Sequence, residues 1–84
     1  MNDDFKIIKM ILKGVEKMKI DLKKLEFLMA EKCIEIRELS KKTGITESTI
    51  SRIKNGKQNA KPVTIGKLAK GLEVQIIELL EKEN

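Results

Sequence analysis

The stretch Glu38 to Gly56 constrains the fold more than any other part of this chain, because a glycine interrupts helical sequence near its centre. Gly44 can enter the left-handed backbone conformation that ends a helix, since it has no β-carbon to clash. Thr46 has a side-chain oxygen suited to capping a new helix, and Glu47 favours the positive end of that helix. The sequence therefore predicts two short helices joined at a sharp turn, a helix-turn-helix motif over about residues 36–55.

The second helix of this motif is unusually polar. Its apolar residues are Ile50 and Ile53, three positions apart on one side of the helix. The positions left facing outward are Glu47, Ser48, Ser51, Arg52 and Asn55. A helix with so narrow an apolar stripe and so wide a polar face is expected to contact a partner.

Length and composition exclude several classes of protein. A chain of 84 residues buries about 60% of its unfolded surface, which leaves room for one core and no catalytic cleft. With no His and a single cysteine, Cys33, it cannot assemble a disulfide framework, a zinc cluster or a Cys–His pair, so Cys33 is interpreted as a helix-end residue. No apolar run approaches the roughly 20 residues of a membrane span, and no signal peptide opens the chain. We expect a cytoplasmic protein that is not an enzyme, needs no metal or cofactor and does not enter membranes.

The net charge of +5 is unevenly distributed. Residues 1–35 contain eight Lys or Arg against seven Asp or Glu, and residues 68–84 contain two against four. Residues 36–67 contain eight basic residues against two acidic ones. Positive charge therefore coincides with the helix-turn-helix, which is typical of a protein that binds a polyanion, although a solvated lysine-rich face is the alternative interpretation.

Three further helices are predicted outside the motif. Asp21 can cap a helix from about Leu22 to Lys32, and Pro62 suits the first turn of another helix. The apolar residues at helical spacing in these two helices are Leu22, Leu25, Leu28, Met29, Ile65, Leu68, Ala69 and Leu72. A last turn or two would close the bundle with Ile76, Leu79 and Leu80, followed by a frayed tail over 81–84. The predicted fold is all-α, with five helices over residues 22–80.

Residues 22–80 resemble the Cro/repressor family of helix-turn-helix domains, the lambda-repressor-like class also called the xenobiotic-response-element type. The matching elements are EL(S) at 38–40, TGIT at 43–46, STISRI at 48–53, NGK at 55–57, Pro62 and LAKGLEV at 68–74. The resemblance implies a five-helix domain that binds double-stranded DNA, usually as a homodimer on an inverted repeat, and represses or tunes transcription. The family also includes antitoxins and phage immunity switches.

The resemblance places the base-reading positions on the second helix of the motif, at Glu47, Ser48 and Arg52, with Ser51 beside them. Arg52 is the strongest candidate, because a guanidinium donates two parallel hydrogen bonds to the O6 and N7 atoms of guanine. Glu47 could accept from a cytosine amino group, but its place at the helix start explains it without DNA. A solvated surface charge is the alternative interpretation of Arg52.

Phosphate contacts are implied where the second helix ends and the next loop begins. A glycine turn is expected to free backbone amides, and long ammonium stems bind phosphate without reading sequence. The residues assigned to this role are Asn55, Gly56, Lys57, Gln58 and Lys61, together with Thr49 and Arg37. The alternative is that GKQNAK at 56–61 is only a polar loop.

Several positions depart from the family pattern. Many relatives carry Ser or Thr followed by Gln at the start of the first helix of the motif, where this chain has Glu35 and Ile36. Ile36 cannot replace a hydrogen bond to the DNA backbone, so either Arg37 takes over or affinity is modest, and Ile36 is an apolar core or sugar contact. Glu73 occupies a position where relatives often have glycine, a milder change that affects packing and stability.

Residues 1–21 are not explained by the family. Phe5, Ile8, Leu12 and Val15 recur at helical spacing, which predicts an amphipathic helix or arm, although Gly14 weakens it. This segment could be a sixth helix on the same core, a dimerisation arm or a partner-binding segment. The last reading supports an alternative function, an antitoxin or adaptor in which DNA binding is secondary.

Two further hypotheses concern the ends of the domain. Ile77 and Leu80 are candidate dimer contacts, because an amphipathic last helix would leave apolar side chains facing away from the core. The sequence from Met18, MKIDLKKLEFL, resembles the ordinary beginning of a family member, so translation could start at Met18 rather than Met1. Such a shorter chain is then expected to fold and bind DNA as well as the full chain.

Overall fold

The computed structural model describes residues 18–82, and the regular elements in this range are helical. Four α-helices, α2 (Leu22–Glu31), α3 (Ile36–Thr43), α4 (Glu47–Lys54) and α5 (Pro62–Leu72), are followed by one turn of 3-10 helix, η2 (Ile76–Glu78). The all-α prediction is confirmed, and the predicted fifth helix of the bundle is this single turn. The predicted helix or arm at the N-terminus lies outside the described residues, apart from its last few positions.

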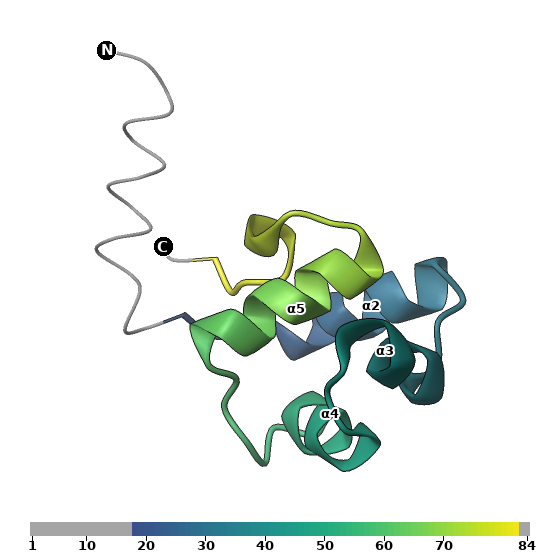
Figure 1. Cartoon of the computed structure of the whole chain (residues 1–84). Helices are drawn as coiled ribbons and strands as arrows, with labels where there is room; N and C mark the ends of the chain where they lie inside the picture. The colour runs from purple at the N-terminus through teal and green to yellow at the C-terminus, as the bar shows by residue number, and fades with distance from the viewer. Residues whose placement is uncertain (1–17, 83–84) are drawn as a thin grey trace.

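The core lies where α3 packs against α5 and α4, and α2 packs against α4. Each α-helix supplies a completely buried side chain, and the chain after η2 supplies another. The largest of these are Leu25, Leu39, Ile50, Ile65, Leu68, Leu72 and Leu79. In Figure 1, α5 crosses the middle of the molecule, α4 lies along the edge opposite η2, and α2 lies behind α5. The α4 helix is therefore attached by one side only and leaves its other side in solvent.

Helix starts follow the capping residues that the sequence indicates. The Asp21 carboxylate accepts hydrogen bonds from the Lys23 and Lys24 amides, at 3.1 and 3.2 Å. At the start of α4 the Thr46 hydroxyl oxygen accepts from the Thr49 amide at 3.2 Å, and Pro62 begins α5. Each bond satisfies one of the amide groups that a first helical turn leaves without a partner. The predicted positions of these three helix starts are confirmed.

All four α-helices end with a residue in the left-handed region of backbone conformation. These residues are Cys33, Gly44, Gly56 and Glu73, with φ angles of 55°, 77°, 74° and 58°. At the ends of α2, α4 and α5, the amides of the left-handed residue and of the residue after it both donate hydrogen bonds to carbonyls of the last helical turn. The Val74 amide, for example, donates to the Ala69 carbonyl at 2.9 Å. Two of these positions carry glycine, which adopts the conformation without strain, whereas Cys33 and Glu73 adopt it against the preference of their β-carbons.

Replacing Glu73 with glycine is therefore expected to stabilise the protein by about 1 kcal/mol, because the left-handed conformation costs a side-chain-bearing residue about 1 to 2 kcal/mol. The midpoint of thermal unfolding should rise by about 4 to 8 °C for a domain of this size. The same change at Glu26, an exposed position inside α2, is the control and should destabilise by about 1 kcal/mol. Equal effects at the two positions would contradict a left-handed Glu73.

The two ends of the described chain pair with each other. Ile20 and Leu80 form an isolated antiparallel β-bridge, in which the Asp21 amide donates to the Leu79 carbonyl at 2.8 Å. The Glu81 amide likewise donates to the Lys19 carbonyl at 2.9 Å. Ile20 is buried, although the sequence predicted that it belongs to the extension before residue 22. The core thus begins before α2.

One predicted core residue is not buried. Ile76 is 40% exposed, so the prediction that it closes the bundle is wrong, while the prediction for Leu79 is confirmed at 0% exposure. The reason is that η2 is a single 3-10 turn in which no residue is buried, and the chain reaches the core only at Leu79, directly after it. In residues 18–82 no helix has both the length and the apolar character needed to cross a membrane.

Candidate nucleic-acid interface

The turn between α3 and α4 is tied by side-chain hydrogen bonds to both of its ends. The Thr43 hydroxyl donates to the Leu39 carbonyl at 2.8 Å, and its oxygen accepts from the Ile45 amide at 3.2 Å. The Ser40 hydroxyl donates to the Ile45 carbonyl. Ile45 itself is buried. The hydrogen bonds of Ser40 and Thr43 and the burial of Ile45 together fix the turn, so α4 lies at a defined angle to the core.

The α4 helix has the division of faces that its sequence predicts. Ile50 is fully buried and Ile53 is 2% exposed, so these two side chains attach the helix to the core. Among the predicted base contacts Glu47, Ser48 and Arg52 are exposed, and Ser51 is half-buried. The structure thus brings the predicted base-reading residues together on the outer side of one helix.

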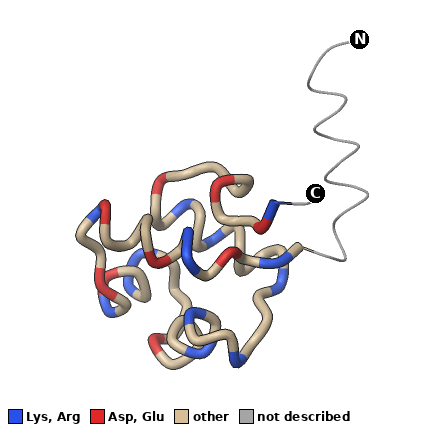
Figure 2. Tube along the Cα trace, turned by 180° about the vertical axis from the view of Figure 1, so that it is seen from behind, with Lys and Arg blue, Asp and Glu red and all other residues tan. Residues whose placement is uncertain are grey.

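Positive charge surrounds this face. Between residues 44 and 67 the only acidic residue is Glu47. Figure 2 shows blue positions on α4 and along the loop that follows it, at the lower end of the molecule. The exposed basic residues of α3, α4, the loop and α5 up to residue 67 are Arg37, Lys41, Lys42, Arg52, Lys57, Lys61 and Lys67. The electrostatic field at α4 therefore favours a polyanion.

Arg52 forms a side-chain hydrogen bond on this face. Its Nε atom donates to Oε1 of Gln58 at 3.0 Å, across the turn that ends α4. Nearby, the Asn55 side-chain amide donates to the Ser51 hydroxyl at 3.5 Å. Thr49 serves the start of its own helix, because its hydroxyl oxygen accepts from the Thr46 hydroxyl at 2.9 Å.

The first three backbone amides after α4 are not free, although the glycine turn predicted that they would be. The Asn55, Gly56 and Lys57 amides donate to the carbonyls of Ser51, Ile53 and Arg52, at 2.9, 3.0 and 2.8 Å. The expectation that the glycine turn frees these amides for phosphate is therefore wrong. The side chains of Asn55, Lys57, Gln58 and Lys61 are exposed and remain predicted phosphate contacts. Glycine suits position 56 for two reasons. Its φ is 74°, and a β-carbon added there would lie 3.3 Å from Cδ1 of Leu22.

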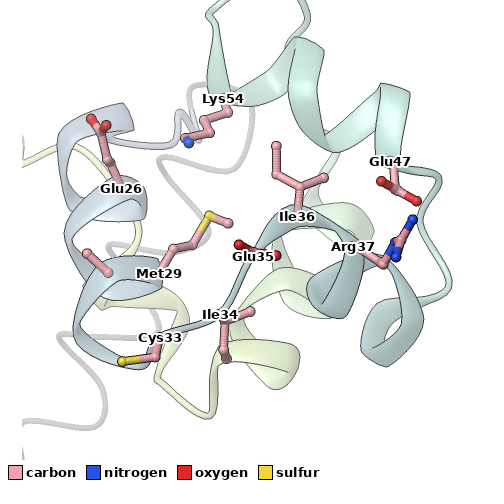
Figure 3. A pocket seen from close by; sticks show the side chains of 10 residues that line it. Glu26, Met29, Cys33, Ile34, Glu35, Ile36, Arg37, Glu47 and Lys54 are labelled. Atoms are coloured by element: carbon pink, nitrogen blue, oxygen red, sulfur yellow. The ribbon is translucent and has the colours of Figure 1, made fainter.

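An open groove of about 790 Å³ lies between α2, the start of α3 and α4. In Figure 3 the Arg37 guanidinium points toward the Glu47 carboxylate at one end of the groove. Ile36 is half-buried and packs against the core, which accounts for an apolar residue at the position where the family resemblance implies glutamine. The groove is lined by Glu26, Met29, Ala30, Cys33, Ile34, Glu35, Ile36, Arg37, Glu47 and Lys54.

Within residues 18–82 no three Asp, Glu, Cys or His side chains meet in a group that could hold a metal ion.

The two candidate dimer contacts lie in different surroundings. Ile77 is 56% exposed on η2, next to the exposed Ile76. Leu80 is half-buried, packs against the core and forms the bridge with Ile20, so it does not share a helix face with Ile77. The exposed apolar side chains of η2 are therefore Ile76 and Ile77.

Comparisons with known proteins agree with this geometry. The family model for the Cro/C1-type helix-turn-helix DNA-binding domain matches residues 24–84. A similar solved structure is the restriction-modification controller protein C.AhdI from Aeromonas hydrophila. It is 26% identical, with a TM-score of 0.66 over 68% of this chain and 86% of that chain. A comparison with curated proteins gives no match. This chain belongs to the Cro/C1-type helix-turn-helix DNA-binding domain family.

Proposed function

We propose that the protein is a sequence-specific transcriptional regulator that binds double-stranded DNA as a homodimer and represses transcription from an inverted repeat. The observation that carries this proposal is α4, which is attached by Ile50 and Ile53 and exposes Ser48 and Arg52 in a positively charged part of the surface. In a helix-turn-helix domain this second helix enters the major groove, where guanidinium and hydroxyl groups distinguish base edges. The proposed base contacts are Glu47, Ser48, Ser51 and Arg52.

A dimer follows from the small reach of one helix. A single α4 contacts only a few base pairs, whereas two copies related by a twofold axis reach major grooves about 34 to 36 Å apart. The exposed Ile77 supports an apolar contact between copies near η2. The similarity to a restriction-modification controller protein supports a regulatory function for this chain, because the match covers 86% of the controller.

The proposal is tested by selecting duplexes from a random pool with the full-length protein and retesting the enriched sites at two salt concentrations. We expect an inverted repeat with half-sites one helical turn apart, bound by two chains per duplex in sedimentation equilibrium. A promoter carrying that repeat should be less active when the protein is present. Weak, strongly salt-dependent binding without any enriched sequence would contradict sequence-specific regulation.

Replacing Lys57 with alanine should weaken binding to every duplex alike. Lys57 is exposed, and alanine keeps the backbone amide that donates to the Arg52 carbonyl, so the turn is preserved. Loss of one phosphate contact is expected to reduce the slope of log affinity against log salt by about one. Lys70→Ala, in the last turn of α5, is the matched control and should leave the slope unchanged. Identical slopes for wild type and Lys57→Ala would remove Lys57 from the phosphate contacts.

The predicted amphipathic segment over residues 1–17, on which the antitoxin or adaptor alternative depends, lies outside the described residues. That alternative stays a prediction of the sequence.

A further inference from the structure

We propose that Gln58 is a positioning residue for base recognition, which holds the Arg52 guanidinium in the orientation that reads guanine before DNA binds. The inference rests on the proposed function and deepens it, because it names the base and the atoms that read it. It gives Gln58 a role different from the phosphate contact predicted from the sequence.

The loop after α4 brings the two side chains together. Gly56 adopts a φ of 74°, and the Lys57 amide donates to the Arg52 carbonyl at 2.8 Å. These features reverse the chain at the helix end, so residue 58 returns alongside residue 52. The Gln58 side chain then accepts a hydrogen bond from Arg52 Nε at 3.0 Å. Residue 52 is thus joined to residues 57 and 58 through both its backbone and its side chain.

This hydrogen bond selects which edge of the guanidinium remains available. An arginine has five N–H donors, one on Nε and four on its two Nη atoms. With Nε engaged by Gln58, the side-on pair of Nε and one Nη is unavailable, and the end-on pair of Nη atoms remains. Two parallel donors of this kind match the O6 and N7 acceptors of guanine in the major groove. Arg52 is exposed on the outer side of α4 in the part of the chain that the structure describes.

The advantage of the arrangement is entropic. An exposed arginine has several rotatable bonds, and ordering one rotamer-rich side chain on binding costs about 0.5 to 1.5 kcal/mol, or about 2- to 10-fold in affinity. The hydrogen bond to Gln58 orders the Arg52 side chain partly in the free protein, so less entropy is lost when DNA binds. The benefit appears on sites where Arg52 contacts guanine and disappears on sites that lack this guanine. Gln58 is therefore expected to raise selectivity more than general affinity.

The test compares Gln58→Leu, which removes the acceptor, with Gln58→Glu, which keeps an acceptor oxygen. Affinity is measured on the site selected by the wild type and on the same site with the guanine replaced. Gln58→Leu should lose part of the discrimination between the two sites, up to about 10-fold. Gln58→Glu should keep the discrimination while binding all duplexes more weakly, because it adds negative charge near phosphates. Asn59→Leu, at the next exposed position of the loop, is the matched control and should behave like the wild type.

A measurement on the free protein separates this inference from the proposed function. The Arg52 Nε–H signal in nuclear magnetic resonance should exchange more slowly with water in the wild type than in Gln58→Leu. In an Arg52→Ala background, Gln58→Leu should cause no further loss of discrimination. A selective wild type with an equally selective Gln58→Leu, or an unchanged Nε–H exchange rate, would overturn the inference alone. A wild type that does not discriminate among duplexes would overturn the proposed function and the inference with it.

Discussion

Replacing Arg52 with alanine is expected to weaken binding to the preferred DNA site by about 1 to 3 kcal/mol and to relax selectivity at one base pair. The physical reason is that alanine removes a two-donor contact whose geometry only guanine matches in the major groove. Arg52 is exposed, and its side chain bonds only to Gln58 among the side-chain hydrogen bonds found in residues 18–82. The folded structure should therefore survive the substitution. Binding isotherms on the selected site and on its single-base variants measure the effect.

A second substitution separates charge from geometry. Arg52→Lys keeps the positive charge but replaces the planar fork with a single ammonium group. It should retain the salt dependence of the wild type and lose most of the discrimination at that base pair. If Arg52→Ala weakens binding equally on every sequence, Arg52 contacts phosphate, and base reading must lie with other residues of α4.

Replacing Gly71 with alanine should destabilise the protein by about 1 to 3 kcal/mol, although alanine is normally the better helix former. A β-carbon at position 71 would lie 2.7 Å from Cγ2 of Thr43 and 3.0 Å from Cδ1 of Leu39. Such separations are too short for carbon atoms, so α3 and α5 would have to move apart. The free energy of unfolding from urea denaturation measures the loss, and the thermal midpoint should fall by about 4 to 8 °C per kcal/mol.

The neighbouring side chains cannot easily make room. Thr43 would have to rotate, but its hydroxyl bonds both the Leu39 carbonyl and the Ile45 amide, and rotation breaks both hydrogen bonds. Leu39 is completely buried among other core side chains. Because Thr43 also forms the turn before α4, the strain is expected to reach the DNA-binding helix. Gly71→Ala should therefore weaken DNA binding even at temperatures where it remains folded.

Gly66 provides the matched control in the same helix. No atom beyond its own helix backbone and chain neighbours lies within 4 Å of a β-carbon added there, so Gly66→Ala meets open space. It should stabilise the protein by about 0.5 to 1 kcal/mol, because glycine costs about that much inside a helix. Opposite signs at positions 66 and 71 would establish close packing of α3 on α5. A stabilised Gly71→Ala would show that this contact is looser than the structure has it.

Much of the fold and of the candidate site could be predicted from neighbouring residues alone. Capping by Asp21 and Thr46 and the left-handed turn at Gly44 depend on groups within a few positions of one another, and the structure has each as predicted. The attachment of α4 through Ile50 and Ile53 followed from their spacing, because helical periodicity decides which side chains share a face. The likeness of the motifs to a known family was enough to predict the binding class.

The sequence by itself determined the four α-helices over residues 22–72, the caps at Asp21 and Thr46, the polar face of α4 and the position of the positive charge, because these properties are local. Only the tertiary structure decided the bridge between Ile20 and Leu80, which joins residues at opposite ends of the domain. It also decided that the amide of Gly56 is already bonded and that Arg52 meets Gln58. These contacts depend on how the chain reverses in space, since hydrogen bonds are satisfied by whichever groups the fold brings within about 3 Å.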